Sequence, residues 1–109
     1  MLLSTSDEIA GREITETIGL VSGNAVRARH LGRDVLAGLK NLVGGEIGAY
    51  QKLLSDSRQI AIERMEEQAT EAGADAIVAV RLATSTITSG ASEVLAYGTA
   101  VKLGSAPVG

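Results

Sequence analysis

Alternating apolar and polar residues predict three β-strands in this chain. The first covers residues 13–22, with Ile14, Ile18 and Leu20 on one face and Thr15, Thr17 and Val21 on the other. Gly23-Asn24 then predicts a turn or bulge, beyond which residues 25–29 can extend the strand. Residues 76–86 and 93–103 alternate in the same way, and Ser89-Gly90 between them favours a hairpin turn.

Apolar residues spaced three and four apart predict two helices between the first and second strands. The shorter covers residues 31–43, and its two internal glycines cost about 1 kcal/mol each, so it needs tertiary support. The longer covers residues 47–72 and ends at Gly73. The predicted fold is therefore a single two-layer α+β domain over residues 1–109, in the order β-α-α-β-β. Its three-stranded, mainly antiparallel sheet packs on the long helix, and residues 104–109 form a loose tail.

The last predicted strand has two contrasting faces. One carries only small side chains, which allow a helix to approach closely: Val94, Ala96, Gly98 and Ala100. The long helix offers alanines at positions 61, 69 and 72, and we predict that these surfaces meet.

The opposite face of the same strand is apolar, and a two-layer domain covers only one face of its sheet. A bare apolar patch is unusual on a monomer, so this face predicts contact with another subunit. The short helix folding back over it is the alternative. Arg81 shares this face and needs a carboxylate partner across the interface, either Asp75 or Glu93. The predicted interface consists of Ile77, Arg81, Leu95, Tyr97 and Val101.

Composition narrows the function classes. The net charge of −3, the absence of Phe and Trp and the presence of only two Tyr exclude an electrostatic or stacking surface for nucleic acid. No apolar run approaches the roughly 20 residues that span a membrane, and no signal peptide is visible. The chain has no cysteine, hence no disulfide or thiolate chemistry. We expect a cytoplasmic protein.

Three motifs resemble the YbjQ-like family of small bacterial and archaeal proteins, which is labelled heavy-metal-binding. They are Val43-Gly44-Gly45-Glu46, Gly73-Ala74-Asp75-Ala76 and Tyr97-Gly98-Thr99-Ala100-Val101-Lys102. Residues 33–39 also resemble the helical segment that precedes the family's double glycine, and the likeness extends from residue 9 to 103. The resemblance implies a βαββ-type subunit that forms a homo-oligomer, either a five-fold ring or two stacked rings. It implies no mechanism.

The family label directs attention to possible metal ligands. His30 and Asp34 are four residues apart and share a helix face if the helix begins early enough, and Glu46 is a third candidate. These residues make a divalent metal ion the candidate cofactor, of unknown identity. The alternative is that His30 is solvated or hydrogen-bonded at a helix start, since soft metals prefer thiolates and several imidazoles.

Two further groups of residues bear on function. The long helix carries an acidic run, namely Glu63, Glu66, Glu67 and Glu71. Its first interpretation is a solvated face, and its second is a surface that pairs with Arg27, Arg29 or Arg33 of a neighbour. A cation site ranks third. The sequence contains no G-x-S-x-G motif, which argues against a Ser-His-Asp hydrolase built on His30 and Asp34. We therefore predict a non-catalytic homo-oligomer that binds a small ligand or metal ion. A purely structural ring is the alternative, and a hydrolytic enzyme ranks third.

Overall fold

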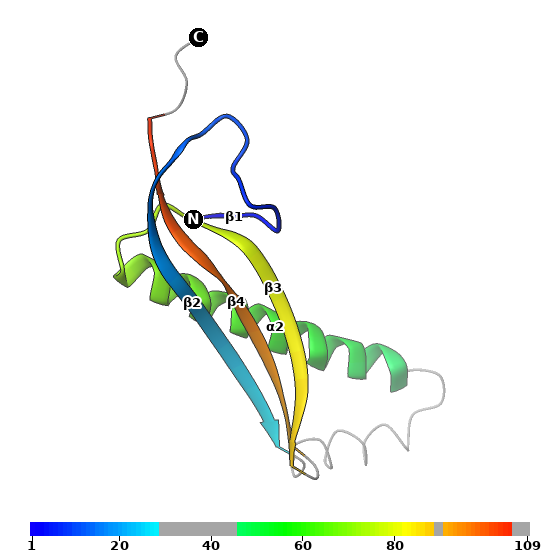
Figure 1. Cartoon of the computed structure of the whole chain (residues 1–109). Helices are drawn as coiled ribbons and strands as arrows, with labels where there is room; N and C mark the ends of the chain where they lie inside the picture. The colour runs from blue at the N-terminus through cyan, green and yellow to red at the C-terminus, as the bar shows by residue number, and fades with distance from the viewer. Residues whose placement is uncertain (29–45, 89–90, 106–109) are drawn as a thin grey trace.

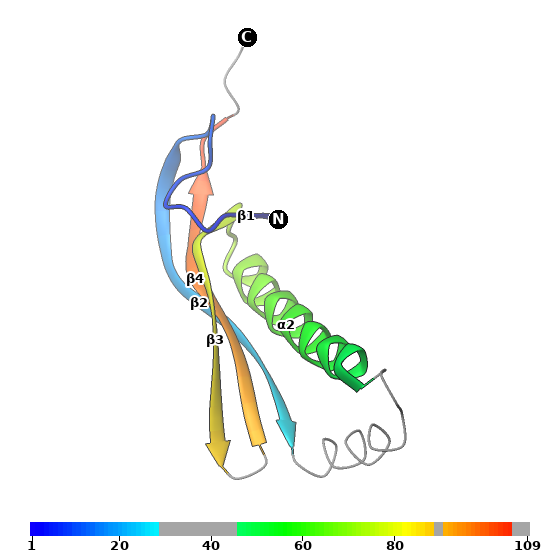
Figure 2. The same cartoon turned by 90° about the vertical axis from the view of Figure 1, so that its right-hand side faces the viewer.

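The structure is a computed structural model that describes residues 1–28, 46–88 and 91–105. Its strands join in one mixed sheet of order β1-β3-β4-β2, in which β1 is parallel to β3 and the other pairs are antiparallel. Helix α2 lies on one face of this sheet (Figures 1 and 2). The elements are β1 (Leu2–Leu3), β2 (Ile14–Ala28), α2 (Glu46–Glu71), β3 (Ala76–Thr88) and β4 (Ala91–Leu103).

The predicted two-layer α+β class is confirmed, whereas the predicted strand count and element order are not. The sheet has four strands rather than three, because Leu2 and Leu3 add a short parallel strand at the edge of β3. A strand of two residues is too short to show periodicity, so the sequence pattern did not predict it. The predicted helix over residues 31–43 and the Ser89-Gly90 turn lie outside the described residues.

Helix α2 ends where the sequence predicts. Gly73 adopts a left-handed conformation with φ of 83°. Its amide donates to the carbonyl of Thr70 at 3.0 Å, and the amide of Ala74 donates to the carbonyl of Ala69 at 3.0 Å. This pair of bonds satisfies carbonyls of the last helical turn and reverses the chain toward β3.

The small-residue face of β4 packs under α2, as predicted. Val94, Ala96 and Ala100 are buried in one cluster with Ala61 and Ala69 of the helix. The same cluster contains Met65, Val21 and Ile77. Ala72, the third predicted contact, is exposed, because it follows the last helical residue at the point where the chain turns away.

Gly23 marks the closest approach of α2 to the sheet. The predicted turn or bulge at Gly23-Asn24 is wrong, since β2 continues through both residues in register with Ala96 and Leu95 of β4. A Cβ built on Gly23 would overlap the carbonyl oxygen of Ala61 and the amide nitrogen of Met65. Glycine is needed here for backbone contact between strand and helix, rather than for a turn.

A bulge in β3 reverses part of the predicted face assignment. Ala79 has a φ of 53°, and the register with β4 shifts between Val78 and Arg81. Ile77 consequently packs into the core under α2 and is 0% exposed, whereas Arg81 pairs with Tyr97 on the opposite face. The placement of Ile77 on the open face was wrong, because strict alternation does not survive an extra residue in one strand.

Strand β2 departs from alternation for the same reason. Its register with β4 shifts twice between Ile14 and Gly19. Ile18 therefore packs against the same cluster as Val21, although the sequence placed them on opposite faces. Leu20, which was grouped with Ile18, is 76% exposed.

The face opposite α2 is partly covered by the chain's own N-terminal segment. Ala76, Val78 and Val101 form a second buried cluster, against which Ile9 and Ile14 pack. Val101 is 1% exposed, so its side chain is enclosed within the subunit and is not available as an open contact surface. Leu95 and Tyr97 farther along β4 are half-buried.

Candidate functional site: a polar pocket at the end of the sheet

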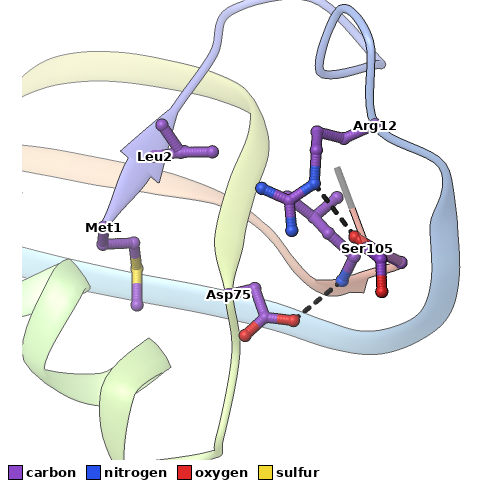
Figure 3. Close-up of a pocket in the computed structure, with 7 residues that line it drawn as sticks. Met1, Leu2, Arg12, Asp75 and Ser105 are labelled. Carbon is purple, nitrogen blue, oxygen red and sulfur yellow. Dashed lines mark hydrogen bonds between the residues drawn. The ribbon is translucent and has the colours of Figure 1, made fainter. Parts of the chain in front are cut away.

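A pocket of about 570 Å³ opens at the end of the sheet where β4 finishes and β3 begins. Segments distant in sequence meet here: the N-terminus with β1, the residue pair before β2, the turn after α2 and the end of β4. Figure 3 shows Arg12 and Asp75 on neighbouring sides of the space. The lining residues are Met1, Leu2, Arg12, Asp75, Leu103, Gly104 and Ser105.

Arg12 supplies the positive charge of this pocket. Its Nε donates a hydrogen bond to the carbonyl of Gly104 at 2.9 Å, and the amide of Gly104 donates to the carbonyl of Glu13 at 2.8 Å. These two bonds tie the start of β2 to the end of β4. None of the described residues accepts a hydrogen bond from the two terminal guanidinium nitrogens of Arg12. Arg12 is half-buried and anchored through Nε, so the N–H groups of its terminal nitrogens remain available as donors.

Asp75 supplies the negative charge and is held just as firmly. It follows the helix-ending glycine, and its amide donates to the carbonyl of Val101 at 2.9 Å. Its Oδ2 accepts a hydrogen bond from the amide of Leu103 at 2.9 Å. Within the described part of the chain, Oδ1 has no hydrogen-bond donor. One oxygen positions the carboxylate, and the other remains able to accept.

This arrangement can bind a small polar molecule. A guanidinium fork pairs with a carboxylate or phosphate through two parallel N–H donors. The carboxylate of Asp75 accepts from an N–H or O–H group, and Leu2 and Leu103 supply apolar surface. Ser105, the hydroxyl among the lining residues, makes no hydrogen bond to any described residue, so no described base activates it.

The predicted metal site stays a prediction, because its side chains lie outside the part of the chain that the structure describes. His30 and Asp34 lie outside the described residues, and Glu46 is the first residue of α2, with its side chain also outside them. Across residues 1–28, 46–88 and 91–105, no three His, Cys, Asp or Glu side chains gather as a metal site. The pocket itself offers a single carboxylate beside an arginine, which does not fit a heavy-metal ion.

The predicted interface residues divide into two sets. Ile77 and Val101 are buried within the subunit, as described above. Leu95 and Tyr97 are half-buried, and Arg81 is exposed. The Nη1 of Arg81 donates to the carbonyls of Thr5 at 2.7 Å and Val80 at 2.9 Å, so backbone groups of the same chain hold one of its terminal nitrogens.

The acidic run matches its first interpretation, a solvated face of α2. Glu63, Glu67 and Glu71 are exposed and Glu66 is half-buried. Gln59 donates to Glu63 at 3.3 Å along the same side of the helix. Pairing of this run with a neighbour's arginines stays a prediction.

Sequence reasoning did not predict that Arg12 and Asp75 line one pocket. Asp75 lies in the Gly73-Ala74-Asp75-Ala76 motif, but Arg12 sits in a turn-rich segment without periodicity. Only the return of β4 beside the start of β2 brings the two residues to one end of the sheet.

The described fold and pocket define a small α+β domain with a mixed four-stranded sheet, one described helix and a polar pocket at the sheet's end. Residues 1–104 match the profile of the YbjQ family, described as "Putative heavy-metal-binding", and the chain belongs to this family. No helix of the described residues is long and apolar enough to cross a membrane.

Relatives of nearly the same length support this assignment. A UPF0145 protein of Vibrio parahaemolyticus is 55% identical over 103 residues, covering 94% of this chain and 98% of the relative. A UPF0145 protein of the archaeon Methanosarcina acetivorans is 52% identical over 103 residues, covering 94% and 97%. The crystal structure of a protein with unknown function, of the DUF74 family from Pediococcus pentosaceus, aligns with a TM-score of 0.64. It is 17% identical and covers 95% of this chain and 98% of its own, so it supports the fold alone.

Proposed function

We propose that this chain is a non-catalytic, cytoplasmic, homo-oligomeric protein that binds a small anionic ligand between Arg12 and Asp75. The observation that carries the proposal is the hydrogen bonding of the Arg12 guanidinium. Its Nε is anchored on Gly104, while its terminal nitrogens have no acceptor among the described residues. An arginine held this way is arranged in advance to bind a carboxylate or phosphate group.

Asp75 narrows the ligand class. Its negative charge beside Arg12 disfavours a ligand that carries several negative charges and no donor. A ligand with one carboxylate or phosphate and an N–H or O–H group satisfies both residues, as an α-amino acid or a hydroxy acid does. The pocket opens widely to solvent, so charge pairing rather than enclosure would hold such a ligand.

Native mass spectrometry of freshly isolated protein tests this proposal. We expect a retained small molecule that is lost from the Arg12→Ala and Asp75→Asn variants. Arg58→Ala is the matched control, because Arg58 is an exposed arginine on α2, remote from the pocket residues. Retention that is equal in all four proteins overturns the proposed site. A bare chain in every sample supports the purely structural ring instead, and a metal lost only on His30→Ala supports the metal site.

The residues of the open face that are not buried within the subunit supply the proposed ring contact. Leu95 and Tyr97 of β4 and Arg81 of β3 remain from the predicted interface, and the family resemblance implies a five-fold ring or two stacked rings. Light scattering coupled to gel filtration should give a mass several times that of the 11.2 kDa chain. A Leu95→Asp/Tyr97→Asp double variant should dissociate while keeping its circular dichroism spectrum. An intact oligomer in this variant would place the contact elsewhere.

A further inference from the structure

Arg12 and Asp75 are anchored on successive residues at the end of β4. The Nε of Arg12 donates to the carbonyl of Gly104 at 2.9 Å, and Oδ2 of Asp75 accepts from the amide of Leu103 at 2.9 Å. Consecutive Cα atoms of a chain are about 3.8 Å apart, so the two anchors lie close together. Figure 3 shows both side chains reaching this one stretch of chain. A guanidinium and a carboxylate are therefore held near each other beside the pocket.

These two opposite charges do not neutralise each other directly. In the part of the chain that the structure describes, no ion pair joins Arg12 to Asp75, and neither pairs with another charged side chain. The terminal nitrogens of Arg12 and Oδ1 of Asp75 keep their hydrogen-bonding capacity, and both residues line the same pocket. Charged groups that share a space without pairing favour a ligand that brings the opposite charge to each of them.

The charges of the ligand follow from what each residue can donate or accept. Arg12 presents only N–H donors, and its planar fork matches the two oxygens of one carboxylate. Asp75 presents a negatively charged acceptor, which an ammonium group matches better than a neutral hydroxyl. Asp75 would repel a phosphate without a cationic group, and Arg12 would repel an amine without an anionic group. A zwitterion is the ligand class that matches both charges.

The closeness of the two anchors selects a compact zwitterion. In a free α-amino acid the carboxylate and the ammonium are bonded to the same carbon atom, so they can reach two groups that are held side by side. In a dipeptide the two charges are one residue farther apart, about 3.8 Å of chain. Met1 and Leu2 line the pocket and are 47% and 46% exposed, so an apolar side chain of the ligand would cover apolar surface there.

We infer that the ligand of this pocket is a free α-amino acid with an apolar side chain, bound by its carboxylate to Arg12 and by its ammonium to Asp75. The inference rests on the proposed function and narrows its ligand class. Because the pocket is open to solvent, the two charged contacts supply most of the affinity. Each is a charge-assisted hydrogen bond, and the loss of one such bond lowers affinity by about tenfold or more.

Isothermal titration calorimetry of the full chain with leucine and close analogues tests each charge of the ligand separately. Leucic acid, the hydroxy acid analogue, replaces the ammonium by a hydroxyl, and leucinamide replaces the carboxylate by an amide. We expect both analogues, and the dipeptide leucyl-leucine, to bind about tenfold or more weakly than leucine. Equal affinity for leucine and leucic acid overturns the inference but leaves the proposed anion site intact.

The Asp75→Asn variant connects this preference to one residue. The side-chain oxygen of asparagine can still accept from the amide of Leu103, while the negative charge is lost. We expect this variant to bind leucine as weakly as leucic acid. Asp7→Asn is the matched control, because Asp7 is exposed and does not line the pocket, and it should keep the wild-type preference. A purely structural role of Asp75 would weaken both ligands alike, so an unchanged preference in Asp75→Asn refutes the inference.

The Arg12→Ala variant separates failure of this inference from failure of the proposed function. It should bind neither leucine nor leucic acid, because both need the guanidinium for their carboxylate. If native mass spectrometry instead finds a retained ligand that depends on Arg12 but is not an amino acid, only the inference fails. If no ligand depends on Arg12, the inference and the proposed function fail together.

Discussion

Replacing Gly23 by alanine tests the packing of α2 on the sheet most directly. The added methyl group would overlap the carbonyl oxygen of Ala61 and the amide nitrogen of Met65, and would lie 2.8 Å from the carbonyl carbon of Arg64. All three atoms belong to the helix backbone, so no side-chain rotation relieves the overlap. Ordinary contact begins at 3.4 Å, so the Arg64 carbon alone must withdraw by about 0.6 Å.

That movement opens the tightest part of the core. Ala61, Met65 and Ala69 are each 0% exposed, and shifting the helix loosens all three at once. Overpacking a core costs about 1–3 kcal/mol when side chains can adjust. Because only the backbone can yield here, we expect a loss of about 3 kcal/mol or more. Such a loss is a large part of the roughly 5–16 kcal/mol total expected of 109 residues.

Urea unfolding monitored by circular dichroism, at one fixed protein concentration, measures this loss. The control is Ser22→Ala on the neighbouring position of β2, whose backbone amide rather than its side chain bonds to Gln68. We expect the control to change the free energy of unfolding by less than about 0.5 kcal/mol. A Gly23→Ala protein as stable as this control would show that α2 does not touch β2 at Gly23.

Two further predictions address the same layer of the structure. Met65→Ala should lower the free energy of unfolding by about 2–5 kcal/mol in the same urea assay, because Met65 is among the largest fully buried side chains. Gln68→Ala should leave the outward amide of Ser22 without its acceptor, and hydrogen exchange at that amide should accelerate. Gln59→Ala, which removes only a bond to exposed Glu63, should leave that exchange rate unchanged.

The family's description and this chain's described residues point to different ligands. Heavy-metal sites use thiolate and imidazole groups, and this chain has no cysteine and a single histidine. The described pocket instead contains one guanidinium and one carboxylate. The metal site predicted at His30, Asp34 and Glu46 stays a prediction, whereas Arg12 and Asp75 both line the described pocket.

The packing of the long helix on the last strand was predictable because it depends on local patterns. Small residues at every second position of β4 face alanines at helical spacing, and both periodicities are visible without a fold. The helix end at Gly73 was predictable for the same reason. The faces of Ile77 and Ile18 were not, because register shifts in β3 and β2 break the alternation that would group Ile77 with Arg81 and Ile18 with Leu20. No composition signal placed the bulge at Ala79.

The candidate pocket depended wholly on the fold. Arg12 and Asp75 line one pocket because β4 runs antiparallel to both β2 and β3. This arrangement brings the starts of β2 and β3 and the end of β4 to the same end of the sheet.

The sequence by itself determined the class of fold, the long helix, the long strands and the small-residue surface between them, since each follows from contacts or periods within one segment. The tertiary structure alone decided which face Ile77 occupies, that a short β1 closes part of one edge, and that Gly23 serves helix contact rather than a turn. These features depend on how distant segments meet, and a one-residue shift in strand register reverses the face of every following side chain.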